Sequence, residues 1–292
     1  MGIKKVIICG LGALGLTYAS KLKTCCDLKI LADEKRIEKY KKNIPTLNGS
    51  EILLDYIAPK DKIDADLIII STKSLGLDSV IESLKNFVSE KTIIISLING
   101  ISSEEKIAKV YKNAKVVRSF FIGHSAMREG NSVFQDGIGK IFIEKNEKLE
   151  GFFTKNNIDY EISDDILRAQ WVKLGVNIIL NQPSAIYRLT VGELRNREDY
   201  LPLAKNLLKE VYEIAKALGI KNLETYEKEV LDSIYLIADD GKTSMYQDVI
   251  ARRKTEVDIF SGEIIRLGKL HNINTPHNLD IYNKIKSIEE NY

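Results

Sequence analysis

The chain has 292 residues, about twice the length of a typical domain of roughly 150 residues, so two packed domains are expected. It carries 43 Lys and Arg against 41 Asp and Glu, a net charge of +2, and 44% of its residues are hydrophobic and 29% charged. This composition is typical of a globular protein. It excludes a disordered, collagen-like or membrane-embedded chain and gives no reason to expect nucleic acid as a partner.

From residue 4 to about residue 120, short β-branched runs alternate with longer amphipathic stretches, as in a parallel sheet whose strands are joined by helices. Strands are expected at 4–9, 28–31, 67–71, 92–96 and 116–121, and helices at 14–23, 77–88 and 103–111. The nearly continuous apolar runs at 67–70 and 93–95 indicate strands buried on both faces. The predicted fold class is therefore α/β, with a doubly wound parallel sheet.

The pattern changes after this region. Residues 134–144 and 159–162 are expected to add strands at one edge of the sheet, with a helix at 149–156 between them. From Asp164 onward the pattern is almost wholly helical; the apolar residues of 200–218 recur every 3.6 positions, and Gly219 then ends that helix. We therefore place a domain boundary near Ser163, with a sheet domain at 1–163 and an all-helical C-terminal domain at 164–292.

The three cysteines, Cys9, Cys25 and Cys26, are odd in number and lie near one end of the chain, so they do not form a disulfide framework. This favours a reducing, cytoplasmic setting. No Cys/His cluster has the spacing of zinc ligands, so no metal site is expected.

A glycine-rich motif follows the first predicted strand and opens a helix. Gly10 permits a tight turn, Gly12 lets the backbone approach a pyrophosphate, and Gly15 allows close packing of helix on strand. Because strand, motif and helix occur in the right order, the motif predicts a Rossmann-type dinucleotide site. Its expected cofactor-binding residues are Gly10, Leu11, Gly12, Ala13, Leu14 and Gly15.

The end of the second strand leaves the choice of cofactor open. Asp33 is placed to accept hydrogen bonds from ribose hydroxyls, which favours NAD, whereas Lys35 and Arg36 follow within reach of a 2′-phosphate, which favours NADP. Alternatively, Asp33 caps a helix that begins at Glu34, and the two basic residues are solvated surface charges.

A second motif lies in 166–180, a stretch that is apolar almost all round the helical wheel. Lys173, Asn177 and Asn181 stand at i, i+4 and i+8, an arc of about 80° on one helix face. A lysine in a buried helix costs several kcal/mol unless it is paired or lines a wet cleft. The alternatives are a salt bridge with satisfied amides, or a polar stripe facing a substrate cleft with Lys173 as proton donor.

A third motif spans 243–258. Ser244 and Gln247 have the spacing of a capping box, which by itself accounts for the serine. Stepping by four, Ser244, Asp248, Arg252 and Glu256 would form a polar strip along one helix face. For Asp248 and Arg252 an ion-pair ladder on a solvated surface is the favoured interpretation.

Three more polar residues follow predicted strands. Lys73 and Asn99 come after the strands at 67–71 and 92–96, and His124 comes after the strand at 116–121. In open α/β sheets ligands bind beyond the carboxyl ends of the strands, so these are candidate binding residues.

Taken together, these features resemble the ketopantoate reductase family over nearly the whole chain. The residues that carry the resemblance are Gly10 to Gly15, Thr72-Lys73, Asn99-Gly100, Lys173 to Asn181, Ala185, Gly192-Glu-Leu194, Ser244 to Asp248 and Thr255 to Asp258. The combination of Lys, Asn and Asn with the later segment from Ser to Glu is more specific than the glycines.

The resemblance implies a Rossmann domain joined to an all-helical domain, with the active site in the cleft between them. Family members reduce ketopantoate to pantoate with NADPH on the route to pantothenate. By the same resemblance, Lys173 is the general acid and Glu256 completes the catalytic site. The residues that bind or orient the substrate are Asn99, Asn177, Asn181 and Ser244, and those that contact the cofactor outside the glycine motif are Arg36, Lys73 and Asn99.

The chain departs from the family pattern at two positions. Ile98 stands where the family often has Gln, and Asp33 stands where a basic residue is common, although Arg36 can supply the phosphate contact, so NADPH is favoured over NADH. The alternatives are an NAD(P)-dependent 2-hydroxy-acid dehydrogenase acting on another branched or aromatic 2-keto acid, and a non-catalytic dinucleotide-binding regulator. The partner expected is a small 2-keto acid, with a homodimer as the expected assembly.

Overall fold

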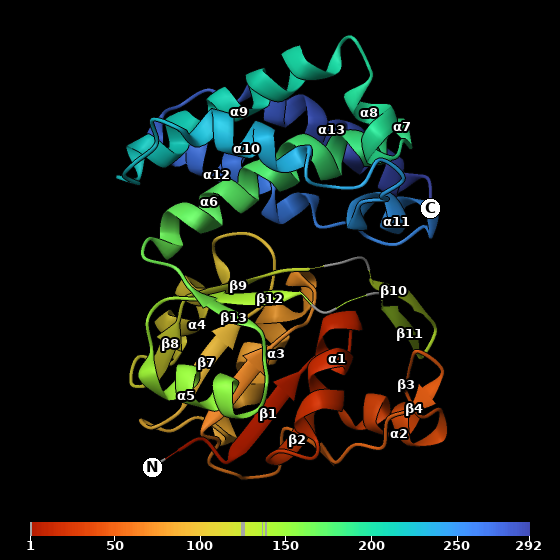
Figure 1. Cartoon of the computed structure of the whole chain (residues 1–292), viewed down its shortest axis with the longest axis vertical. Coiled ribbons are helices and arrows are strands. Elements are labelled where there is room, and N and C mark those ends of the chain that lie inside the picture. The colour runs from red at the N-terminus through yellow and green to blue at the C-terminus, as the bar shows by residue number, and fades with distance from the viewer. Residues whose placement is uncertain (1, 124–125, 136, 138) are drawn as a thin grey trace. The chain divides into compact units, whose positions relative to one another are not determined.

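The computed structural model of the chain describes residues 2–123, 126–135, 137 and 139–292 (Figure 1). Its contacts divide the chain into two compact units, Met1–Ile166 and Leu167–Tyr292. The division falls three residues after the boundary expected near Ser163. His124 lies outside the described residues.

The first unit is built on a sheet of parallel strands in the order β5-β2-β1-β6-β7-β8. These strands are β1 (Lys5–Cys9), β2 (Asp27–Leu31), β5 (Tyr56–Ile57), β6 (Leu67–Ile70), β7 (Ile93–Ser96) and β8 (Lys115–Val117). Winding reverses at β1, where Ile8 lies beside Ile30 of β2 on one side and Ile69 of β6 on the other. The switch point, where ligands bind in such sheets, therefore lies at the carboxyl ends of β1 and β6.

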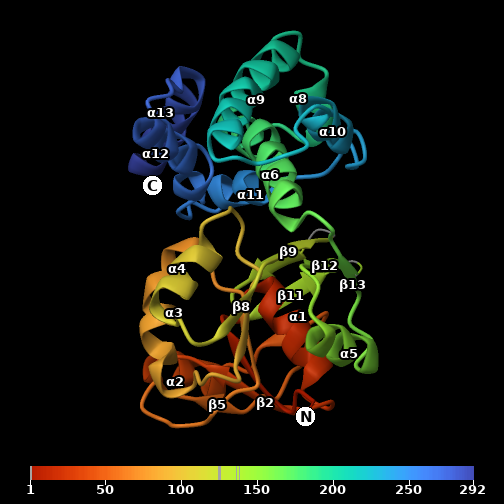
Figure 2. The ribbon, with the colours of Figure 1, turned by 90° about the vertical axis from the view of Figure 1, so that its left-hand side faces the viewer.

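Helices cover this sheet on both sides, which confirms the predicted doubly wound architecture. In Figure 2, α3 (Leu77–Ser83) and α4 (Ser103–Val110) lie on one side, and α1 (Ala13–Leu22) and α5 (Glu147–Lys155) lie on the other. The remaining helix of this unit is α2 (Glu34–Lys42), and α3 has short 3-10 turns, η1 (Ser74–Gly76) and η2 (Leu84–Asn86), at its two ends. All four residues of β6 are buried, as the apolar run predicts.

The strands expected at 134–144 and 159–162 do not join the edge of the main sheet but belong to two smaller sheets. One has the order β13-β12-β9 and the other β10-β11-β3-β4. Their strands are β3 (Thr46–Leu47), β4 (Ser50–Glu51), β9 (Ser119–Ile122), β10 (Ala126–Glu129), β11 (Ser132–Gln135), β12 (Lys140–Ile143) and β13 (Tyr160–Ile162). The prediction that 134–144 and 159–162 extend the main sheet was therefore wrong.

The predicted strand at 116–121 is also split, because the chain changes sheets at Arg118. The N–H of Arg118 donates to Glu144 Oε1 and that of Ser119 to the buried Glu104 Oε1, each at 3.3 Å. Side chains thus satisfy the two backbone donors that leave the β8 ladder, so the strand can end without an unpaired buried N–H. Farther on, Gly137, with φ of +73°, interrupts the run at 134–144.

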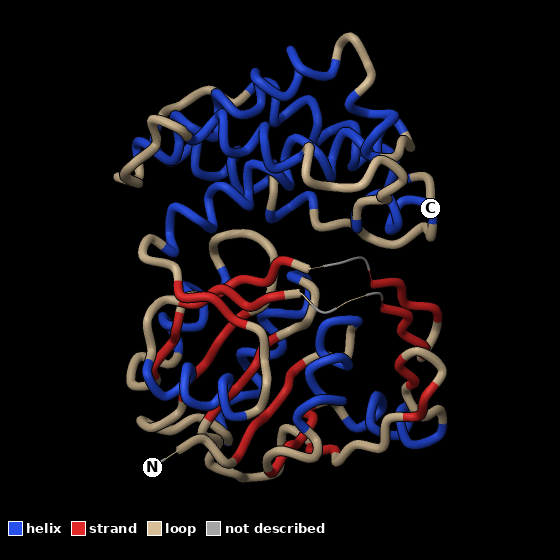
Figure 3. The backbone as a smooth tube through the Cα atoms, viewed as in Figure 1, coloured by secondary structure: helices blue, strands red, loops and turns tan. Residues whose placement is uncertain are grey.

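The second unit, all of whose residues are described, contains helices and no strand (Figure 3). Its elements are α6 (Ile166–Val176), the π-helical turn η3 (Asn177–Asn181), α7 (Gln182–Tyr187), α8 (Val191–Arg195), α9 (Tyr200–Ala217), α10 (Tyr226–Ile234), α11 (Ser244–Ile250), the 3-10 turn η4 (Val257–Ile259), α12 (Ser261–His271) and α13 (Pro276–Glu290). Its core contains fully buried residues of α9, α12 and α13, including Val211, Ile264 and Ile285.

The end of α9 is as predicted. Gly219 adopts φ of +76°, the N–H of Gly219 donates to Lys216 O, and that of Ile220 donates to Ala215 O, both at 3.0 Å. This pair of hydrogen bonds is a Schellman motif, which needs a residue in the left-handed conformation at the position of the glycine.

Candidate active site

Each of the three glycines in the glycine-rich loop is explained by a different feature of its surroundings. Gly10 has φ of +99°, and a Cβ there would lie 2.8 Å from Thr72 N. A Cβ on Gly15 would lie 1.9 Å from Gly10 O, so only glycine permits α1 to pack on the loop. At Gly12 the nearest atom to a Cβ would be Ser71 O at 3.8 Å. Among the described residues nothing requires glycine at position 12, so the space that it leaves open fits an approaching ligand.

The beginning of α1 is suited to an anion. Gly12 is its N-cap and provides no side-chain hydrogen bond, and the first turn contains no acidic residue. The amide groups of the first turn, at Ala13, Leu14 and Gly15, therefore keep the partial positive charge of a helix N-terminus. An anionic pyrophosphate fits this arrangement.

Two uncharged side chains, those of Ser71 and Cys9, lie beside the loop. Ser71 Oγ, at the end of β6, donates to Gly10 O at 2.9 Å and so joins the two strands at the switch point. Cys9 is buried directly before Gly10, and burial raises the pKa of its thiol to about 12. The thiol is uncharged at neutral pH, so it does not repel an anion.

At the end of β2, Asp33 caps α2 and pairs with Arg36. Its Oδ1 accepts the N–H of Arg36 at 2.8 Å, and its Oδ2 lies 3.3 Å from Arg36 Nε, with both side chains more than half exposed. Asp33 therefore caps the helix that begins at Glu34, as one of the two interpretations predicted, and Arg36 partly balances its charge. A pocket of about 410 Å³ is lined here by Asp33, Glu34, Lys35, Ala58, Pro59 and Lys60.

Lys73 and Asn99 lie at the same edge of the sheet. Lys73 precedes η1 after β6, and Asn99 follows β7, the parallel neighbour of β6. Gly100 has φ of +92°, so the turn after Asn99 uses a conformation that glycine adopts without strain. The buried side chain of Ile98 packs inward at this point. The structure thus gathers the predicted residues of the first unit along the carboxyl edge.

In the second unit the predicted regular helix at 166–180 was wrong in its last turn. The chain widens into a π-turn at Asn177–Asn181, which closes hydrogen bonds from i to i+5 and brings residues four apart closer to one line than an α-helix does. Asn181 Nδ2 donates to Asn177 Oδ1 at 3.2 Å. Pro183 explains the widening, because its ring clashes with the carbonyl of residue i−4 in a regular α-helix.

The hydrogen bond from Asn181 uses the Oδ1 of Asn177 but not its Nδ2 group. Its Nδ2 is buried and has no hydrogen-bond partner among the described residues. A buried amide N–H without an acceptor costs about 1–3 kcal/mol. An acceptor oxygen from a ligand would satisfy this donor. Lys173 stands one turn earlier on α6, half-buried, on the segment that leads into Asn177.

A chain of buried polar side chains supports the π-turn, and we did not predict it. Gln182 Nε2 donates to Ile178 O at 3.2 Å and to Ser261 Oγ at 2.9 Å; Ser261 Oγ donates to Asn278 Oδ1 at 2.8 Å. Asn278 Nδ2 donates to Glu210 Oε2 at 2.8 Å. The polarity of Gln182 beside an apolar stretch was the only local signal.

Helix α11 begins and ends differently from the prediction. Its N-cap is Thr243, whose Oγ1 accepts the N–H of Tyr246 at 3.2 Å, so Ser244 is the first helical residue and the predicted capping box was wrong. Gln247 Nε2 donates instead to Lys242 O at 3.0 Å. The amide therefore binds the backbone before the cap.

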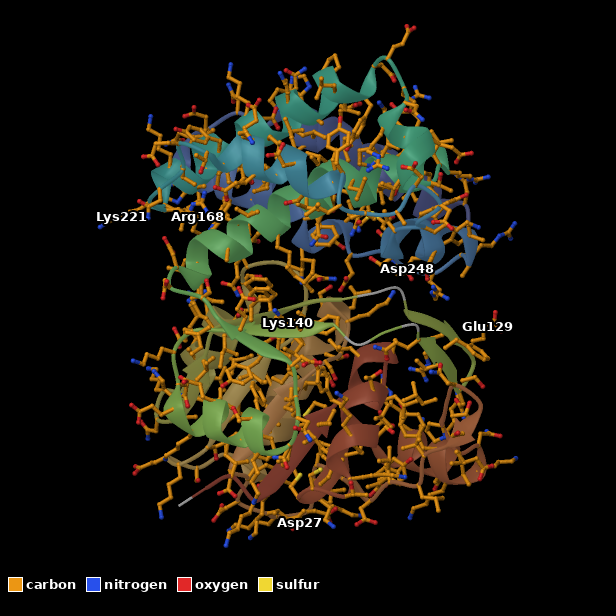
Figure 4. All side chains as sticks on the ribbon, in the orientation of Figure 1. Asp27, Glu129, Lys140, Arg168, Lys221 and Asp248 are labelled. Carbon is orange, nitrogen blue, oxygen red and sulfur yellow. The ribbon has the colours of Figure 1, made fainter. Side chains whose placement is uncertain are left out.

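The polar strip predicted at 244–256 was also wrong. The helix ends at Ile250, and Arg252 adopts φ of +50°, so Glu256 is not on its face. Asp248, labelled in Figure 4, is 5% exposed and pairs with Arg253 Nε at 2.9 Å rather than forming a surface ladder with Arg252. Glu256 is half-buried and opens η4.

The helical unit still brings several predicted residues near one another. Helix α11, which Ser244 opens, packs against α7 and the π-turn. Ser184 Oγ lies 2.6 Å from Thr243 Oγ1 and 3.0 Å from Asn181 O, which joins the start of α11 to the end of the π-turn. Asn177, Asn181 and Ser244 thus belong to one local structure.

The described residues hold no group of three or more His, Cys, Asp or Glu side chains arranged to bind a metal. Among the same residues, no helix is both long and apolar enough to span a bilayer. Cys9, Cys25 and Cys26 are all free.

Comparison with known proteins identifies the family. Residues 6–148 match the model of the ketopantoate reductase PanE/ApbA family, and residues 165–289 match that of its C-terminal domain. A 2-dehydropantoate 2-reductase of Pyrococcus horikoshii is 27% identical over 297 residues, which cover 98% of this chain and 97% of that protein.

Solved structures agree. A dimeric ketopantoate reductase from Staphylococcus aureus is 26% identical with a TM-score of 0.77, and the match covers 98% of this chain and 99% of that one. D-mandelate dehydrogenase, in a ternary structure with NADH and anilino(oxo)acetate, shares the fold at 21% identity with a TM-score of 0.88 and the same coverage. The chain belongs to the ketopantoate reductase family.

Proposed function

We propose that this chain is a 2-dehydropantoate 2-reductase, which reduces ketopantoate to pantoate with NADPH on the route to pantothenate and coenzyme A. The observation that carries the proposal is the match of both units to the family, with relatives of that activity aligned over nearly the whole chain. The open space at Gly12 and the uncapped start of α1 fit the pyrophosphate of the cofactor. When bound, the cofactor supplies the hydride.

Lys173 is the proposed general acid. As the keto carbon is reduced, negative charge grows on the carbonyl oxygen, and an ammonium group both stabilises that charge and delivers the proton. The expected contribution of general-acid catalysis is about 10²- to 10⁴-fold.

The other predicted residues bind or orient the substrate. Asn177 has a buried donor that no described residue accepts and that suits a substrate oxygen, and Asn181 fixes the orientation of that amide through its hydrogen bond to Oδ1. Asn99 and Ser244 are proposed to bind the substrate, and Glu256 to complete the catalytic site. Lys73 and Asn99 are proposed to contact the cofactor.

We assign NADPH on the charges around the pocket beside Asp33. Lys35 and Lys60 line this pocket and Arg36 pairs with Asp33, so three basic side chains lie near the position where a 2′-phosphate would bind. The second candidate is an NADH-dependent 2-hydroxy-acid dehydrogenase acting on another 2-keto acid, and Asp33 is the residue that favours it.

The proposed assembly is a homodimer, since the similar enzyme from Staphylococcus aureus is dimeric. The proposed location is the cytoplasm, because a chain whose three cysteines are free suits a reducing compartment.

The test is a turnover assay with NADPH and NADH against ketopantoate and a panel of branched and aromatic 2-keto acids. We expect the highest kcat/KM for ketopantoate with NADPH. Lys173→Ala should lower kcat by about 10²-fold or more and leave the Kd for NADPH within about 2-fold. Preference for another keto acid with NADH would support the second candidate, and cofactor binding without any turnover would overturn both.

A further inference from the structure

The hairpin of β10 and β11 is held against the nucleotide-binding loop. Its strand β11 pairs with β3, and the N–H of Gln135 donates to Asn48 Oδ1 at 2.8 Å while Asn48 Nδ2 donates to Gln135 O at 3.1 Å. The Gln135 side chain accepts a hydrogen bond from Thr17 Oγ1 in α1. The small sheet therefore fixes the hairpin beside the helix that the glycine-rich loop opens.

Arg128, on β10, reaches from this hairpin to the loop itself. Its Nη1 donates to Leu11 O at 2.5 Å, and its Nε donates to Gly130 O at 2.9 Å. Leu11 lies between Gly10 and Gly12, so the guanidinium is placed at the centre of the motif although the two residues are 117 positions apart in sequence.

The charge of Arg128 has no acidic partner among the described residues. The hydrogen bonds of its half-buried side chain go to two neutral carbonyls, and its Nη2 makes none with the residues that the structure describes. Its neighbour Glu129, labelled in Figure 4, is exposed, and successive strand residues point to opposite faces. A partly buried cation without a counter-charge is costly, and an anion at the same place removes that cost.

We propose that Arg128 binds the pyrophosphate of the dinucleotide, and that the small sheet serves to carry this arginine to the glycine-rich loop. The inference rests on the cofactor binding of the proposed function. Arg128 supplies a full positive charge with two terminal nitrogens, one fixed on Leu11 O and the other open for a phosphate oxygen. The start of α1 supplies only a partial charge and backbone N–H groups.

The test measures Kd for NADPH and NADH by titration of nucleotide fluorescence, without substrate. Both nucleotides contain the pyrophosphate, and only NADPH carries a 2′-phosphate. Arg128→Gln keeps a donor for Leu11 O but removes the charge, and it should weaken both nucleotides by about the same factor, roughly 10- to 100-fold. Arg128→Lys, which keeps the charge without the fork, should lie between wild type and Arg128→Gln.

Two matched variants make the pattern specific. Arg36→Gln should weaken NADPH and leave NADH within about 2-fold, and Glu129→Gln, a charge change on the same hairpin, should leave both within about 2-fold. Higher salt should weaken wild-type binding more than that of Arg128→Gln. The melting temperatures without nucleotide, measured for every variant, should stay close to that of wild type.

Several outcomes would overturn the inference. If Arg128→Gln bound both nucleotides with the Kd values of wild type, or lost affinity for NADPH alone, the arginine would not contact the pyrophosphate. If Arg128→Gln lowered the melting temperature without nucleotide and left the salt dependence of nucleotide binding unchanged, Arg128 would only have a structural role, connecting the hairpin to the loop. If wild type bound neither nucleotide, the proposed function itself would fail, which is a distinguishable result.

Discussion

Glu210 on α9 is a buried carboxylate that caps another helix, and its neutralisation should destabilise the helical unit. It is 7% exposed. Its Oε1 accepts the N–H of His277 at 2.8 Å, and its Oε2 accepts the N–H of Asn278 at 2.9 Å and the Asn278 side-chain amide at 2.8 Å. The carboxylate thus satisfies two backbone donors at the start of α13, where the helix dipole also favours a negative charge.

The magnitude for Glu210→Gln follows from these contacts. With its remaining oxygen at the Oε2 position, the amide keeps both hydrogen bonds from Asn278 but places an NH₂ group opposite the N–H of His277. One backbone donor is then unsatisfied, at about 1–3 kcal/mol, and the charge at the helix N-terminus is lost, at about 0.3–1 kcal/mol or more. The expected loss in free energy of unfolding is therefore about 1–4 kcal/mol.

Urea unfolding measures this loss. Trp171, the only tryptophan of the chain, is buried in α6, so its fluorescence reports on the helical unit. With m of about 2 kcal/mol/M, the midpoint should fall by roughly 0.5–2 M at an unchanged m. Glu213→Gln, at an exposed position of the same helix, is the control and should change stability by less than about 0.5 kcal/mol. Equal effects of the two substitutions would refute the capping role of Glu210.

Three further predictions concern the nucleotide-binding unit. Gly12→Ala should leave the melting temperature nearly unchanged, because its Cβ would lie 3.8 Å from the nearest described atom, yet it should weaken NADPH binding at least 10-fold. Gly15→Ala should instead destabilise the unit, because its Cβ would lie 1.9 Å from the carbonyl oxygen of Gly10. Calorimetry with and without nucleotide separates these effects, and equal melting temperatures of the two variants would contradict them. Asp33→Asn should raise the preference for NADPH over NADH in steady-state assays, since it removes a negative charge near the 2′-phosphate and releases Arg36; a fall in that preference would refute the assignment. Iodoacetamide at pH 8 should alkylate the exposed Cys25 first, because burial raises the pKa of the other two thiols to about 12 and about 11; peptide mass spectrometry reads the order, and early labelling of either would contradict it.

The main sheet and the glycine-rich loop could be predicted because their signals are local. Runs such as 67–70 are apolar at every position, and the spacing of Gly10, Gly12 and Gly15 follows from sterics within one turn. The lysine and asparagines of the helical unit were found for the same reason, since polar residues stand out in an apolar stretch.

What could not be predicted depends on partners far away in sequence. The change of sheet at Arg118 requires carboxylates from Glu104 and Glu144, and no local pattern marks it. Helix α11 ends where Arg252 takes a left-handed conformation without being glycine. Arg128 could not be predicted as a binding residue, because its sequence surroundings do not show that its hairpin lies against Leu11.

The π-turn at Asn177–Asn181 has a consequence for the end of the chain. The hydrogen bonds that hold it open pass through Gln182 and Ser261 to Asn278, a residue of the last helix. A truncation that removes α13 would leave the polar groups of Gln182 and Ser261 facing a void behind the proposed substrate amides. The final segment is therefore an internal brace of the helical unit.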